Sequence, residues 1–106
     1  MAGGAVKFVR IGQFQAREDS VEELCRIYST EAIPEICAAG GNVGAFLFRP
    51  QQTANEFLAM TVWKTREDAE AYERSGQAKK MVDKIRHTFA SAPVLSTYDA
   101  YGFDLG

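Results

Sequence analysis

Two segments of the sequence are apolar at consecutive positions, and this pattern limits what the chain can fold into. Residues 43–48 (Val-Gly-Ala-Phe-Leu-Phe) and 57–63 (Phe-Leu-Ala-Met-Thr-Val-Trp) read as β-strands. A strand with one face in water alternates apolar and polar side chains, and these two segments do not. The sheet that contains them therefore needs a cover on each of its faces.

The other segments give the order of the elements. Residues 6–14 and 94–101 are rich in β-branched and aromatic side chains and predict a first and a fourth strand. A helical pattern follows the first strand, and another follows the third. The order βαββαβ predicts an α+β, ferredoxin-like fold: a four-stranded antiparallel sheet with two helices on one face.

Local signals mark the helix ends. Ser20 and Glu23 have the spacing of a capping box, and Thr65 precedes the second helix as its N-cap. Pro34 predicts a kink or restart within the first helix, because proline lacks an N–H and its ring strikes the preceding turn. Ser75-Gly76 should interrupt the second helix.

The two helices can cover only one face of the sheet. The other face has an area on the order of 350 Å² in projection, which reaches the size of an interaction surface. Residues 102–106 are too few to cover it. Its burial against a second copy contributes roughly 9 kcal/mol per protomer before the entropic cost of association. We expect a homodimer in which the two sheets face each other, a dimeric α+β barrel.

Composition excludes several classes of protein. The 106 residues suffice for a single domain, residues 1–106, and the net charge of −2 comes without a basic stripe for nucleic acid. No apolar run approaches the roughly 18 residues of a membrane span. The start lacks the pattern of a signal peptide, and Cys25 and Cys37 form no disulfide framework, so we expect a cytoplasmic protein with reduced, buried thiols.

No segment predicts a metal site or a cofactor. The sequence has one histidine and two separated cysteines, which cannot make a zinc site, and no glycine-rich phosphate loop follows a strand. The histidine, His87, lies about 180° around its helix from the apolar stripe, so we expect it on the solvent face.

Residues 57–101 resemble the antibiotic biosynthesis monooxygenase family of dimeric α+β barrels. A strand ends in Trp63-Lys64, and the segment 65–75 (Thr-Arg-Glu-Asp-Ala-Glu-Ala-Tyr-Glu-Arg-Ser) opens a helix that carries an aromatic residue and then a serine. The first half of the chain is similar too. The resemblance implies the fold and the dimer, and a family that includes cofactor-free oxygenases of quinols and polycyclic aromatics, haem-degrading oxygenases and an isomerase.

The resemblance disfavours haem degradation. The family's first-strand asparagine falls among Ile11, Gly12 and Gln13, its helix tryptophan falls on Tyr72, and its histidine falls on Met81 or Val82. No imidazole is present at that position to ligate iron.

The match to the oxygenase of polyketide tailoring is partial. Trp63 matches, and Arg86 is an approximate match to a late arginine. Ala59 and Ala69 stand where that enzyme has an asparagine and a tyrosine. Tyr72 could present a phenol from the next turn.

These arguments give a set of candidate residues. A cofactor-free oxygenase needs an apolar slot and hydrogen-bond donors near a developing oxyanion. The candidate catalytic residues are Trp63, Tyr72 and Arg10, and the candidate substrate-binding residues are Gln13, Ala59, Ala69, Met81 and Arg86.

Each candidate also has a structural reading. Trp63 could be a core aromatic that closes the helix–sheet interface. Arg10 and Gln13, polar residues in a central strand, either line the cavity or form an ion pair with Asp99 or Glu56.

Two functions follow from the sequence. The first is a cofactor-independent monooxygenase that acts on a quinol or a polycyclic aromatic molecule. The second is a non-catalytic or accessory barrel whose cavity binds a small apolar ligand or is filled by side chains.

Overall fold

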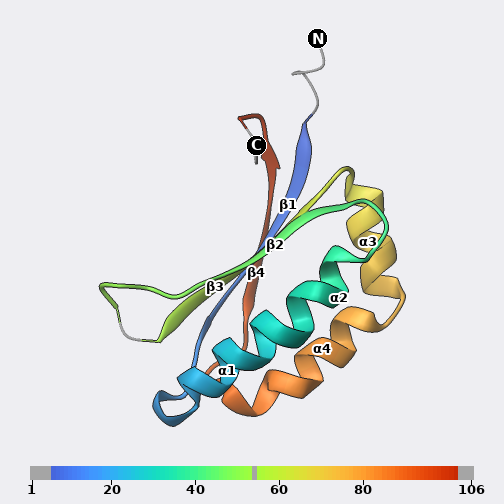
Figure 1. Ribbon diagram of the computed structural model, residues 1–106. Coiled ribbons are helices and arrows are strands. Elements are labelled where there is room, and N and C mark those ends of the chain that lie inside the picture. Colours follow the sequence, from blue (N-terminus) through green and yellow to red (C-terminus); the bar gives the residue numbers. More distant parts are fainter. Residues whose placement is uncertain (1–5, 54, 103–106) are drawn as a thin grey trace.

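The computed structural model describes residues 6–53 and 55–102, and it shows a sheet with a layer of helices on one side (Figure 1). The start of the chain and residues 103–106 of the tail considered above lie outside the described residues. In the part described, no helix has the length and apolar character needed to cross a membrane.

The four strands are antiparallel and pair in the order β2-β3-β1-β4. They are β1 (Lys7–Gln15), β2 (Asn42–Phe48), β3 (Glu56–Trp63) and β4 (Val94–Ala100). β1 and β3 are therefore the two central strands. The predicted ferredoxin-like arrangement is confirmed.

Two helical segments cover one face of the sheet, and each is divided. The first comprises a 3₁₀ turn, η2 (Glu18–Ser20), then α1 (Val21–Ile27), a π-helical segment, η3 (Tyr28–Ala32), and α2 (Ile33–Cys37). The second comprises α3 (Arg66–Arg74), α4 (Gln77–Ile85) and a 3₁₀ turn, η4 (Arg86–Thr88). Gly76, at φ 85°, separates α3 from α4, as the sequence predicts.

The helix passes Pro34 through a π-helical turn. The N–H of Ile33 donates to the carbonyl of Tyr28, five residues earlier, which widens the turn just before the proline. Pro34 then occupies the first turn of α2, where a backbone N–H would have no partner within that helix, so its absence costs no hydrogen bond. The predicted interruption is thus a change of helical pitch within one continuous segment.

One predicted cap forms and the other does not. The Thr65 hydroxyl accepts a hydrogen bond from the N–H of Asp68 at 3.1 Å. The capping box predicted at Ser20 is wrong: its hydroxyl donates to Asp19 at 3.1 Å and makes no cap bond. Ser20 ends a 3₁₀ turn with ψ near 5°, whereas an N-cap needs extended backbone to aim its oxygen at the first turn.

Alternation along the strands divides the side chains between the two faces. Phe14, Phe57 and Trp63 point toward the helices and pack with Leu24 and Met81 in the main core. Cys25 is half-buried and Cys37 exposed, and neither forms a disulfide. The expectation of two buried thiols is wrong for Cys37, because α2 ends at that residue, on its exposed last turn.

Candidate functional site

A pocket of about 210 Å³ lies between the helix-covered face of the sheet and the helices. Its floor is formed by alternate residues of the two central strands, and its walls by η3, α2, α3 and α4. Glycine and alanine positions leave the space, because their side chains do not reach across it. The small lining residues are Gly12, Ala32, Ala59, Ala69 and Ala78.

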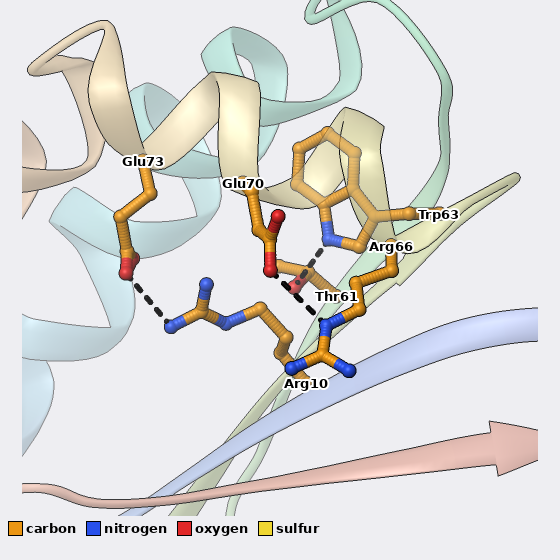
Figure 2. Close-up of polar contacts among 6 residues, drawn as sticks. All are labelled: Arg10, Thr61, Trp63, Arg66, Glu70 and Glu73. Atoms are coloured by element: carbon orange, nitrogen blue, oxygen red, sulfur yellow. Dashed lines mark hydrogen bonds and ion pairs between the residues drawn. The ribbon is translucent and has the colours of Figure 1, made fainter.

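An aromatic pair forms one wall of the pocket. The rings of Trp63 and Tyr72 lie 5.3 Å apart between centroids at an interplanar angle of 37°. The indole N–H of Trp63 donates to the hydroxyl of Thr61 at 2.9 Å, a contact drawn in Figure 2. Trp63 is 1% exposed, so packing and this bond both hold the indole in place. Trp63 is therefore a core residue and a pocket wall at once.

Two phenols line the pocket and remain protonated at neutral pH. Burial raises the pKa of Tyr28 to about 12. Burial, and then the nearby carboxylate of Glu35, raise the pKa of Tyr72 to about 12. The Tyr72 hydroxyl donates to Glu35 at 3.4 Å. Both phenols can donate a hydrogen bond, but neither ionises readily.

One ion pair lies at the edge of this apolar space. Arg10 of β1 donates through Nη2 to Oε1 of Glu73, near the end of α3, at 3.0 Å (Figure 2). The side chain of Arg10 is 20% exposed and that of Glu73 is 51% exposed. Among the described lining residues they are the only charged ones. A guanidinium has five N–H donors, and this bond uses one of them.

The structure brings six of the eight candidate residues to the pocket. They are Arg10, Ala59, Trp63, Ala69, Tyr72 and Met81. These residues come from four different elements, and strand alternation or helical periodicity turns each of them inward.

Gln13 and Arg86 lie elsewhere. Gln13 is an odd number of residues from Arg10, so strand alternation places it on the opposite face, where it is exposed beside Val94. The expectation that Arg10 and Gln13 line one cavity is met for Arg10 alone. Arg86 lies in η4, 63% exposed, and pairs with Asp83 at 2.7 Å.

The candidate residues did not include three lining residues with polar side chains, Tyr28, Thr61 and Glu73. Thr61 could have been predicted from strand alternation, since it lies two residues before Trp63 and therefore on the same face of the sheet. Glu73 carried no such signal, because the Arg10–Glu73 pair joins residues 63 positions apart. The partners expected for Arg10 were Asp99 and Glu56, and these lie opposite Phe8 and Gln15 in the sheet.

The histidine lies away from the pocket. His87 is 55% exposed, as expected, and its Nε2 lies 2.9 Å from a carboxylate oxygen of Glu23. Across residues 6–53 and 55–102, no group of three or more His, Cys, Asp or Glu side chains is arranged to hold a metal ion.

Solved structures share this fold at low sequence identity. A conserved protein from Methanosarcina mazei Go1 matches with a TM-score of 0.79 at 11% identity, over 92% of this chain and 95% of its own. A "putative antibiotic biosynthesis monooxygenase" from Nitrosomonas europaea matches with a TM-score of 0.77 at 18% identity, over 90% and 89%. At these identities the likeness establishes the fold alone. No curated protein matches the sequence.

The family is established by the sequence itself. Residues 7–84 match the family model described as "Antibiotic biosynthesis monooxygenase", a segment that runs from the start of β1 into the last turn of α4 and holds most of the pocket. The chain therefore belongs to the antibiotic biosynthesis monooxygenase family.

Proposed function

We propose that the protein is a cofactor-independent monooxygenase that oxidises a quinol in the pocket beside Trp63, and that it works as a homodimer. The observation that carries this proposal is the composition of the pocket. It is an apolar slot with an aromatic wall and a single guanidinium, Arg10, aimed along its edge. These are the features that a flat, electron-rich ring with one developing negative charge requires.

The size of the pocket narrows the substrate. A dry cavity of about 150 Å³ holds benzene, and sites for drug-sized ligands run from about 300 Å³. A pocket of about 210 Å³ lies between these values and suits a ring system of one or two rings. A quinol of that size fits better than a polycyclic aromatic with three or four fused rings.

The chemistry needs no electron source beyond the substrate. A deprotonated quinol passes one electron to dioxygen, and the two radicals join through a new C–O bond to give a ring hydroperoxide. The C–H bond at that ring carbon and the O–O bond then break, water leaves, and the ring retains one oxygen atom. The quinol loses two hydrogens and gains one oxygen to become a hydroxyquinone, and the ring supplies all four electrons that reduce dioxygen. Arg10 stabilises the quinolate oxygen, and the attraction between the guanidinium and this oxygen grows as negative charge develops on it.

The uncovered face of the sheet supports the homodimer. The helices lie on the pocket side, so the opposite face presents apolar side chains to solvent in one subunit. Phe48 is 44% exposed, Leu58 37%, Val94 67% and Tyr98 53%, and these side chains lie on β2, β3 and β4 of that face. A second copy of the same face is the complementary cover, related by a two-fold axis.

The alternative is a barrel that binds a small apolar ligand without turning it over. The hydrogen bonds inside the site favour this reading, because the N–H of Trp63 is taken by Thr61 and the hydroxyl of Tyr72 by Glu35. Among the described lining residues, Arg10 is then the one cationic donor available to a substrate oxygen. The two functions share the pocket and differ in whether oxygen is consumed.

Oxygen uptake on addition of one- and two-ring hydroquinones separates the two functions. The protein is first stripped of flavin and metals. We expect uptake that survives this treatment, falls about 100-fold or more in Arg10→Ala, and falls in Trp63→Phe. Arg66→Ala is the matched control, because Arg66 is 71% exposed and pairs with Glu70 outside the pocket (Figure 2). Binding of a quinol without uptake would establish the ligand-binding barrel instead.

A further inference from the structure

The proposed oxidation begins with the loss of a phenolic proton, and the pocket must supply a group to take it. An uncharged quinol transfers an electron to dioxygen poorly, whereas its anion does so readily. The described lining residues include four ionisable side chains, which are Arg10, Tyr28, Tyr72 and Glu73. The base should be among them, because general-base catalysis requires hydrogen-bond reach of the proton.

Three of the four cannot accept the proton at neutral pH. The guanidinium of Arg10 does not deprotonate in proteins. Tyr28 and Tyr72 are held in the neutral form, with the pKa of each raised to about 12. Glu73 is the remaining side chain, and a carboxylate is an acceptor with two oxygens.

The placement of Glu73 suits proton removal. Its Oε1 is bonded to Arg10 at 3.0 Å, so a proton acceptor and a cationic donor stand side by side at the edge of the apolar slot. A quinol hydroxyl that enters between them can give its proton to the carboxylate while its oxygen accepts from the guanidinium. Because Glu73 is about half exposed, the proton can pass on to solvent water.

We infer that Glu73 is the general base that forms the quinolate, with Arg10 as the cation that holds the resulting oxygen. This inference rests on the proposed function of the same pocket. The O–H bond of the quinol breaks, its electron pair stays on the ring oxygen, and the proton moves to Glu73. That proton is returned through solvent to the peroxide formed on the ring, and hydroxide then leaves together with the ring C–H proton, so the overall products are hydroxyquinone and water.

The test compares Glu73→Gln with Glu70→Gln. Glu70 lies one turn earlier on α3 and pairs with Arg66 at 3.1 Å, away from the pocket, so it is a matched control for loss of one helix carboxylate (Figure 2). Both ion pairs are partly exposed and contribute little to stability, so both variants should fold, which circular dichroism checks. We expect Glu73→Gln to lower kcat for an unsubstituted quinol about 100-fold, and Glu70→Gln to leave it unchanged.

A series of hydroquinones with electron-withdrawing substituents gives the decisive readout. Phenols ionise near a pKa of about 10, and each unit of lower substrate pKa increases the quinolate present in solution about tenfold. The rate of Glu73→Gln should therefore recover steeply along the series at fixed pH, while the wild-type rate changes little. If the rate of the Glu73→Gln variant recovers only with the more acidic quinols, the result supports Glu73 as the general base.

The outcomes separate the two levels of the proposal. Wild-type protein that consumes no oxygen with any quinol refutes the proposed oxygenase and this inference with it. Wild-type activity with an equally active Glu73→Gln variant overturns the base alone. An equal loss of rate across the whole series also overturns it, because Glu73 would then act only by positioning Arg10.

Discussion

Replacing Leu58 with aspartate should separate the proposed homodimer while leaving each subunit folded. Leu58 lies on β3, a central strand, in register with Phe48 on one side and Gln13 on the other, on the face away from the helices. It is 37% exposed in the single subunit, so a partner sheet would bury the rest of it.

The size of the effect follows from that exposure. Full burial of a leucine side chain is worth about 1.5–3 kcal/mol, so burying the remaining third contributes about 1 kcal/mol per protomer. A two-fold interface contains the residue twice, which gives about 2 kcal/mol. Removing two carboxylates from water adds at least a similar cost. A total of about 4 kcal/mol or more weakens the dimer about 1,000-fold.

The assay is sedimentation velocity at micromolar concentration, with Leu95→Asp as the control. Leu95 is the same residue type and is 61% exposed, but it lies opposite Gly12 on the helix side of the sheet. Leu58→Asp should sediment as a monomer with unchanged circular dichroism, and Leu95→Asp as a dimer. A wild-type chain that remains a stable monomer, or equal behaviour of the two variants, would refute the reasoning about the open face.

Two further predictions concern Gly41, in the turn between α2 and β2, and the buried phenols. Gly41→Ala should destabilise the protein by about 1–3 kcal/mol, measured by urea unfolding, because Gly41 has φ 81° and a Cβ there would collide with the side chain of Asp68. Gly40 has open space around it, so Gly40→Ala should be close to neutral. Equal effects of the two substitutions would contradict the backbone strain expected at Gly41. Tyr28 and Tyr72 should titrate near pH 12 in the folded protein, as followed by tyrosinate absorbance and by Tyr→Phe variants. Because burial favours the neutral phenols, their contribution to the free energy of unfolding is fully present below pH 10 and is lost as pH rises toward 12. Release of both protons near pH 10 from the folded protein would show that the phenols are not desolvated.

The fold could be predicted because its signals are local and repeated. Apolar runs located the hairpin strands β2 and β3, and Gly76 and Thr65 marked a helix break and a helix cap where the structure has them. Ser20 failed as a capping box because a 3₁₀ turn before α1 changes its backbone, a feature that residue spacing alone does not reveal. The change of pitch at Pro34 was located by the sequence, but the residue pattern did not reveal its form as a π-helical turn.

The site was only partly predictable for a geometric reason. Ala69 and Tyr72 share a helix face, and Trp63 ends the strand before them, so local spacing was enough to bring them together. The contact of Arg10 with Glu73 depends on how α3 crosses β1, which no local pattern encodes. Gln13 could have been excluded, since strand alternation alone separates it from Arg10.

In the proposed function, the pocket oxidises an aromatic ring with dioxygen and with electrons from the ring itself. Mass spectrometry of the product formed under isotopically labelled dioxygen tests this directly, with flavin- and metal-free wild-type protein and a two-ring hydroquinone. We expect a hydroxyquinone that carries one labelled oxygen atom, with the second label recovered in water. Product without label, or unmodified quinone accompanied by hydrogen peroxide, would contradict it.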